Sequence, residues 1–92
     1  MIKEWKVYIV KCSDGTYYTG ITTDINRRIL EHNYSFKAAK YTRSRRPVRL
    51  VYTESAGDRS IASKREYKIK KLKRKNKQIL IEGVENEIKN RI

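Results

Sequence analysis

Two strand-like segments separated by three turn residues constrain the fold more than any other feature of the sequence. Residues 5–12 read Trp-Lys-Val-Tyr-Ile-Val-Lys-Cys and carry apolar side chains on both alternating faces. This pattern is typical of a central strand that is covered on both sides. Residues 16–22 are again rich in Tyr, Thr and Ile. The intervening Ser13-Asp14-Gly15 therefore predicts a β-hairpin.

The length of the hairpin loop decides which side chains share a face of the sheet. A two-residue Asp14-Gly15 loop would place Tyr8 and Tyr18 on opposite faces. A three-residue loop with Gly15 in the left-handed conformation would pair Tyr18 with Val10 and place it on the same face as Tyr8. The Ser-Asp-Gly triplet favours the three-residue loop.

The rest of the chain predicts helices that pack on a small sheet. We expect Thr23-Asp24 to cap a short helix that runs to about Asn33. Residues 34–47 resemble a basic loop, and residues 48–53 (Val48 to Thr53) a third strand.

A second helix is predicted after this third strand. Ser55-Ala56-Gly57-Asp58 is expected to turn the chain, and Asp58 to cap a long helix that ends or bends near Asn76. Gly83 is expected to break whatever follows. The order β-β-α-β-α-α predicts an α+β fold, a three-stranded antiparallel sheet flanked by helices. We expect one domain over residues 1–92, with a core of about 4–82 and 83–92 as a short extension.

Charge and composition indicate a polyanionic partner. The 92 residues carry a formal net charge of +13, from 23 Lys and Arg against 10 Asp and Glu. Between Glu31 and Glu54 there are six bases and no acid, and residues 64–77 hold nine bases and one acid. A solvated face is the simpler explanation of one such run, but two in one small domain favour phosphate binding. The candidate nucleic-acid-binding residues are Lys37, Lys40, Arg43, Arg45, Arg46, Lys70 and Lys71.

The same composition argues against other classes of protein. No apolar run approaches the roughly 18 residues of a membrane span. Cys12 is the only cysteine, which excludes an internal disulfide and a cysteine-based zinc cluster. The N-terminal residues lack an apolar signal core. We therefore expect a cytoplasmic protein with no membrane partner.

Several side chains could carry chemistry. Arg28 and His32 are four residues apart and share the inward side of the first predicted helix, which favours either an anion site or side chains that snorkel at the core boundary. Glu66 falls at the rim of the apolar face of the second predicted helix, as an ion-pair partner or as a metal ligand. A tyrosine surrounded by bases could lose its proton more easily than usual and act as a proton acceptor.

These residues occur in an order that resembles the GIY-YIG nuclease superfamily. The order is Lys6-Val7-Tyr8, then Tyr18-Thr19-Gly20, then Arg28, His32 and Glu66. The chain looks closest to the small stand-alone bacterial members, which are related to the N-terminal nuclease domain of the excision-repair incision protein. The sequence departs from the pattern where Lys6 replaces the glycine of the first tripeptide. Thr19 at the middle of the second is a β-branched replacement that we expect to be harmless.

The resemblance implies hydrolysis of phosphodiester bonds in nucleic acid, with DNA favoured, and one divalent cation, Mg²⁺ or Mn²⁺. It implies that Tyr18 acts as the base, that Tyr8 assists, and that Arg28 steadies the phosphate. His32 would orient a group or transfer a proton, and Glu66 would hold the metal. The alternative is a nucleic-acid-binding module with weak or no catalysis. A protein partner could supply specificity, and we expect a monomer or a weak dimer.

Overall fold

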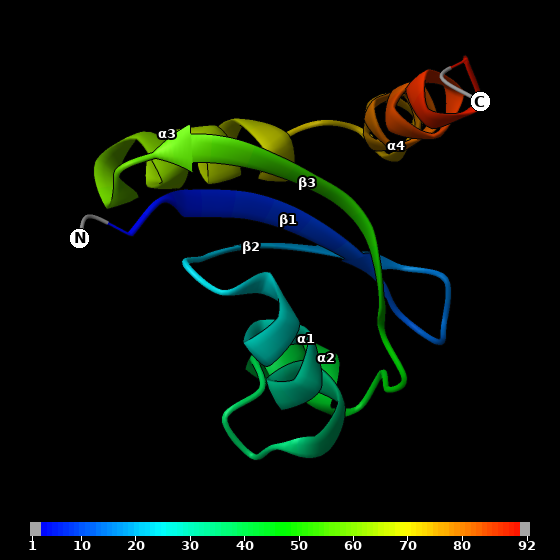
Figure 1. Ribbon diagram of the computed structural model, residues 1–92. Coiled ribbons are helices and arrows are strands. Elements are labelled where there is room, and N and C mark those ends of the chain that lie inside the picture. The colour runs from blue at the N-terminus through cyan, green and yellow to red at the C-terminus, as the bar shows by residue number, and fades with distance from the viewer. Residues whose placement is uncertain (1–2, 91–92) are drawn as a thin grey trace.

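A three-stranded antiparallel sheet lies between two layers of helices (Figure 1). The structure is a computed structural model that describes residues 3–90, and its side chains as far as residue 83. The strand order in the sheet is β2-β1-β3. The elements are β1 (Trp5–Lys11), β2 (Tyr17–Thr22), α1 (Ile25–Tyr34), α2 (Lys40–Arg43), β3 (Arg49–Gly57), α3 (Arg59–Lys70) and α4 (Arg74–Asn90). The predicted fold class and order of elements are confirmed, with the short α2 added inside the predicted basic loop.

The β1–β2 hairpin has the three-residue loop. The Gly15 amide donates to the Cys12 carbonyl at 3.0 Å, and Gly15 has a φ of +84°. Only glycine adopts this left-handed conformation without a steric penalty. In the resulting register Val10 pairs with Tyr18 and Tyr8 pairs with Gly20. The prediction that Tyr8 and Tyr18 share a face is therefore confirmed.

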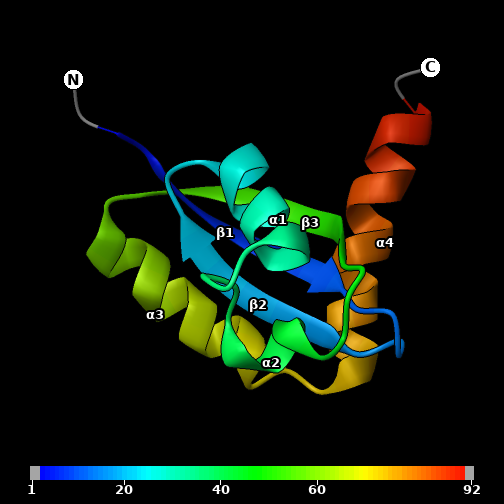
Figure 2. The same cartoon turned by 90° about the horizontal axis from the view of Figure 1, so that it is seen from below.

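The central strand β1 is buried on both faces, as its sequence predicts. Val7 and Ile9 are completely buried in a cluster with side chains from α3 and α4. Tyr8 and Val10 point to the opposite face, where Ile25 and Ile29 of α1 and Val48 pack against them. Complete burial of side chains of this size stabilises the fold by about 1.5–3 kcal/mol each. Figure 2 shows α1 and α2 in front of the sheet.

The C-terminal end of α1 fastens the segment that follows it. The Asn33 side chain binds both backbone groups of Val48, donating to its carbonyl at 3.0 Å and accepting from its amide at 2.7 Å. Arg46 donates from Nε to the His32 carbonyl at 2.6 Å and also binds the Ser35 carbonyl. These contacts hold residues 35–47 against the helix that carries Arg28 and His32.

The predicted ends of two elements are wrong, and so is the predicted break at Gly83. The strand β3 continues to Gly57 instead of ending at Thr53, because β1 pairs with it as far as Trp5. Helix α3 ends at Lys70 instead of near residue 76, and the turn that follows lets Ile81 of α4 join the same core cluster as Ile69 of α3.

Gly83 does not break α4, which is continuous from Arg74 to Asn90. Gly83 is exposed, and no other part of the described chain lies within 4 Å of where its Cβ would be. A glycine in a helix costs only about 1 kcal/mol relative to alanine, so one such residue does not end a helix. No helix within the described residues is long and apolar enough to cross a membrane.

Candidate active site

Tyr8 lies at the centre of the predicted site and crosses over Gly20 of the neighbouring strand. Tyr8 is 1% exposed. A Cβ atom at Gly20 would lie 2.4 Å from the Tyr8 hydroxyl and 2.6 Å from Cζ, distances that no folded protein tolerates. The glycine of the second tripeptide is therefore required by the side chain of the first.

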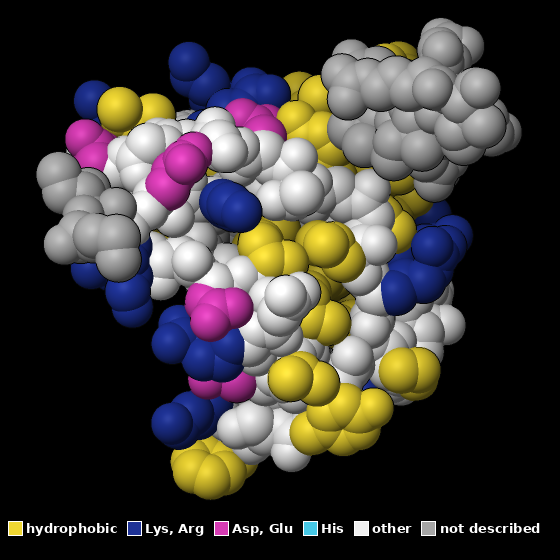
Figure 3. Space-filling model, in the orientation of Figure 1, with side chains coloured by type: hydrophobic (Ala, Val, Ile, Leu, Met, Phe, Trp, Pro, Cys, Tyr) yellow, Lys and Arg dark blue, Asp and Glu magenta, His cyan; other side chains and the backbone are white. Residues whose placement is uncertain are grey.

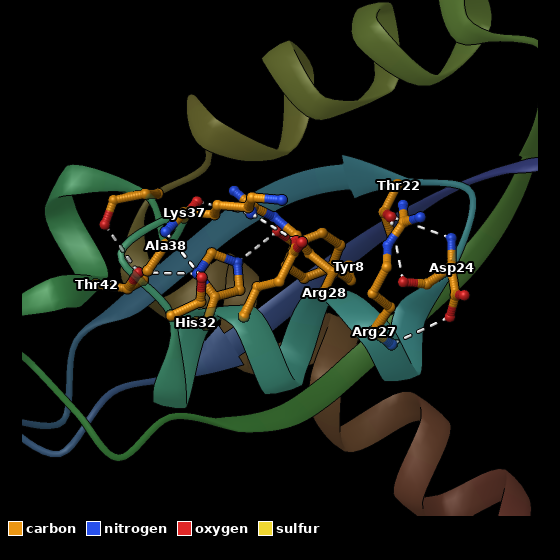
Figure 4. A network of polar contacts seen from close by, with 12 residues as sticks. Tyr8, Thr22, Asp24, Arg27, Arg28, His32, Lys37, Ala38 and Thr42 are labelled. Carbon is orange, nitrogen blue, oxygen red and sulfur yellow. Dashed lines mark hydrogen bonds and ion pairs between the residues drawn. The ribbon is translucent and has the colours of Figure 1, made fainter.

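A chain of hydrogen bonds leads from Tyr8 into the helix α2 (Figure 4). The Tyr8 hydroxyl lies 2.7 Å from His32 Nε2, and His32 Nδ1 lies 2.8 Å from Thr42 Oγ1. The Thr42 hydroxyl donates to the Ala39 carbonyl at 3.0 Å. Because the only proton of Thr42 is used there, its oxygen must accept from His32 Nδ1–H. A neutral His32 then accepts at Nε2, so the Tyr8 hydroxyl donates to it.

Burial keeps this imidazole neutral. His32 is fully buried, and burial lowers its pKa to about 4, helped by the positive charges of Arg28 and Arg46 against the opposite effect of Glu31. Burial also raises the pKa of Tyr8 to about 12, although Arg28 acts in the other direction. The expectation that nearby bases ease proton loss is therefore wrong for Tyr8, because desolvation of the phenolate exceeds their attraction.

Arg28 lies beside Tyr8 and is held in place by two acceptors. Its Nη1 atom donates to Glu31 at 3.1 Å and to the Lys37 carbonyl at 3.0 Å. Its guanidinium is close enough to the Tyr8 hydroxyl to lower the pKa of Tyr8 through a hydrogen bond and charge. Arg28 is also only partly buried, so part of its guanidinium faces solvent. This group can bind an anion from outside while it contacts Tyr8.

Tyr18 and Glu66 complete the cluster. The Tyr18 ring meets the His32 ring edge-on, with centroids 5.4 Å apart. Lys70 lies 5.7 Å from the Tyr18 ring centroid and 3.5 Å from the Glu66 carboxylate. Glu66 is thus linked to Tyr18 through Lys70, and its charge also raises the pKa of Tyr8, less than burial does. The structure thus brings all five predicted catalytic and metal-binding residues together.

The predicted nucleic-acid-binding residues do not all lie free on the surface. Arg46 is used inside the fold, as described above. Arg45 binds Asp14 at 3.1 Å and stacks on Tyr41, and Arg43 donates to the Ala38 carbonyl at 3.3 Å. The remaining residues of the set are exposed: Lys37 and Lys40 before and in α2, Lys70 beside the site, and Lys71 over the Tyr67 ring.

The donor set near Glu66 suits a hard divalent cation that is held jointly with substrate. The described residues contain no group of three or more His, Cys, Asp or Glu that could hold a metal by itself. The two ring nitrogens of His32 are both occupied by hydrogen bonds, and Glu31 is paired with Arg28 at 3.1 Å. Glu66, whose contact with Lys70 is longer at 3.5 Å, is the carboxylate left to bind a cation. Mg²⁺ is commonly bound by one or two carboxylates, waters and substrate phosphates.

Thr42 was not predicted as part of the site. Its backbone lies in α2, a four-residue helix with no periodic pattern to predict it, and it reaches the site only because the segment after α1 folds back. Thr42 is fully buried, and its hydroxyl determines which nitrogen of His32 carries the proton. No spacing rule links the two residues, which are ten positions apart.

Comparison with known proteins agrees with this geometry. The GIY-YIG catalytic domain family matches residues 4–79. A UPF0213 protein of Desulfotalea psychrophila is 64% identical over 81 residues, covering 88% of this chain and 74% of its own length. A UPF0213 protein of Halobacterium salinarum is 57% identical over 74 residues, covering 80% of this chain and 95% of its own.

Solved structures give the same result. The solution structure of protein EF2693 of Enterococcus faecalis has a TM-score of 0.62 at 42% identity, covering 90% of this chain and 88% of its own. That of a UPF0213 protein of Bacillus halodurans has a TM-score of 0.55 at 47% identity, covering 86% and 83%. The fold is that of a GIY-YIG catalytic domain. The chain belongs to the GIY-YIG family and, within it, to the UPF0213 group.

Proposed function

We propose that this protein is a metal-dependent endonuclease that hydrolyses phosphodiester bonds, with DNA as the substrate. The observation that carries the proposal is the convergence of Tyr18 and Arg28 on the buried Tyr8–His32 pair, with Glu66 linked to Tyr18 through Lys70. The match to the GIY-YIG catalytic domain family supports phosphodiester hydrolysis as the reaction. The net charge of +13 favours binding to the phosphate backbone of nucleic acid.

Arg28 is the group that would hold the scissile phosphate. Its position is fixed by Glu31 and the Lys37 carbonyl, so it does not have to reorganise when negative charge develops on the phosphate oxygens. Lys70 adds a second positive charge near Tyr18. A guanidinium presents several donors in a planar fork that matches phosphate oxygens.

Tyr18 would take the proton of the attacking water. Its side chain is only partly buried, so water can reach it from outside the protein. Tyr8 is suited to assist as a neutral hydroxyl, because its pKa is raised to about 12 and its proton is already donated to His32. Its oxygen lone pairs remain able to accept a hydrogen bond.

His32 would orient Tyr8 and not carry its proton. An imidazole whose pKa is lowered to about 4 is a weak proton acceptor at neutral pH. Its Nδ1–H is also committed to Thr42. Of the two roles expected from the sequence, orientation is therefore the one that fits the geometry.

Glu66 would hold the divalent cation, together with oxygens of the substrate. The ion would neutralise charge on the phosphate when it is bound. The pairing of Glu66 with Lys70 at 3.5 Å leaves the carboxylate available, since both side chains are partly exposed and such pairs are weak.

The experiment is a cleavage assay with plasmid, single-stranded DNA and RNA, each with Mg²⁺, with Mn²⁺ and with a chelator. Wild-type protein should cut DNA only when metal is present. The Glu66→Gln variant should not cut DNA even with metal. The matched control is Glu82→Gln, which removes the same charge from an exposed site on α4. If wild type binds DNA but cuts none of the substrates under any condition, the protein is a binding module and the proposal is wrong.

A further inference from the structure

A basic hollow borders Arg28. It has a volume of about 320 Å³ and is lined by Trp5, Thr23, Arg27, Arg28, Glu31 and Arg59, among others. These residues come from the start of β1, the segment before α1, α1 itself and the start of α3. Figure 3 shows a hollow at the left edge of the molecule, with Lys and Arg side chains on both sides of it.

The charges around this hollow are not balanced by the protein. Three arginines line it, and Glu31, its one carboxylate, is already paired with Arg28 at 3.1 Å. Arg27 and Arg59 are exposed and form no ion pair within the described part of the chain. Arg59 lies 5.6 Å from the centroid of the Trp5 ring. Like charges that converge without a counter-charge favour an anionic ligand.

We propose that Arg27 and Arg59 bind a second phosphate of the nucleic-acid strand whose scissile phosphate is bound by Arg28. Arg28 connects the two sites, because its guanidinium lies beside Tyr8 and the residue also lines the hollow. A single strand that enters the site therefore places an adjacent backbone phosphate between the two helix starts. This assignment rests on the proposed function, and it adds two residues that lie outside both basic runs of the sequence.

The test measures binding of a fluorescently labelled oligothymidylate of about 12 nucleotides, with a chelator present, over a range of salt concentrations. For single strands, each phosphate contact contributes about 0.7 to the slope of log affinity against log salt. We expect the Arg27→Ala/Arg59→Ala double variant to lower that slope by about 0.7. The matched control, Lys11→Ala/Arg49→Ala, removes two charges at the opposite end of β1 and should lower it by less than half as much.

Trp5 supplies an independent readout, because it is the only tryptophan in the chain. Its fluorescence should change when the strand binds to wild type and to the control variant. It should not change in the Arg27→Ala/Arg59→Ala variant. Circular dichroism spectra of the three proteins should coincide, which shows that each is folded.

The outcomes separate this inference from the proposed function. If wild type binds the strand while the double variant keeps the full salt slope and Trp5 does not respond, the second phosphate site is refuted and the nuclease proposal stands. If wild type does not bind the strand at all, the second phosphate site on a single strand is refuted, and the cleavage assay decides the proposed function separately. If a polyglutamate peptide of equal charge changes Trp5 fluorescence as strongly as the oligonucleotide does, the hollow binds an acidic protein segment and the assignment to nucleic acid is overturned.

Discussion

Replacement of Gly20 by alanine tests the packing on which the site depends. The new Cβ atom would lie 2.4 Å from the Tyr8 hydroxyl, so the phenol must move by about 1 Å to reach ordinary van der Waals contact. Tyr8 and His32 are both buried, so water cannot replace their 2.7 Å hydrogen bond once the phenol has moved.

The expected cost has two parts. Overpacking of a close-packed interior costs about 1–3 kcal/mol, and a buried polar group left without a partner costs about 1–3 kcal/mol more. We therefore expect Gly20→Ala to lower the free energy of unfolding by about 2–6 kcal/mol. The stability of a domain of this size is roughly 5–14 kcal/mol, so the variant should fold but unfold at much lower urea concentration.

Urea unfolding followed by circular dichroism measures this change. The control is Gly83→Ala, the same substitution at an exposed helical position with no neighbour within 4 Å of the new atom. It should raise stability by about 0.5–1 kcal/mol. If Gly20→Ala lies within about 0.5 kcal/mol of wild type, Tyr8 is not fixed across Gly20 and the derived geometry of the site is wrong.

Three further predictions concern the buried polar groups. The pKa of His32 is lowered from 6.5 to about 4, so between these pH values only the unfolded chain binds this proton. The free energy of unfolding should therefore fall by up to about 3 kcal/mol as the pH drops from 6.5 to 4. In urea titrations, His32→Gln should remove this dependence of stability on pH. Thr42→Val should lower the free energy of unfolding by about 1–3 kcal/mol and move the His32 proton from Nδ1 to Nε2, as seen in ¹⁵N NMR spectra. Thr42→Ser should keep both the stability and the tautomer of wild type. An unchanged tautomer in the valine variant contradicts the derived hydrogen-bond chain. Thr19→Val should raise the thermal unfolding midpoint and add about 1 kcal/mol to the free energy of unfolding, because the buried Thr19 hydroxyl has no hydrogen-bond partner within the described residues. A lower midpoint would show that this hydroxyl does have a hydrogen-bond partner.

The sequence predicted the parts of the fold that depend on local chemistry. The Ser13-Asp14-Gly15 loop determines the register of the hairpin, so the shared face of Tyr8 and Tyr18 followed from turn preferences. Asp24 and Asp58 cap their helices as predicted, each accepting from a backbone amide three residues on. The spacing of Arg28 and His32 likewise placed both on the inward side of α1.

What could not be predicted depends on tertiary contacts. The end of α3 at Lys70 follows from the return of Ile81 to the core, and no residue near Lys70 signals it. The use of Arg46 inside the fold depends on two carbonyls that come within reach only after the chain folds back. The pKa of Tyr8 is raised because desolvation exceeds the effect of nearby charge, and the sequence shows the charge but not the burial.

The most direct test of the proposed function is the single-turnover rate of DNA cleavage by Arg28→Ala, measured with Mg²⁺ and with protein in excess over substrate. The protein concentration is raised until the rate no longer increases, so all substrate is bound and a weaker affinity does not lower the rate. Loss of a preorganised group that stabilises developing charge should lower the rate by about 10²–10³-fold, while Arg49→Ala stays near wild type. Equal rates for Arg28→Ala and wild type would show that cleavage does not occur at this cluster.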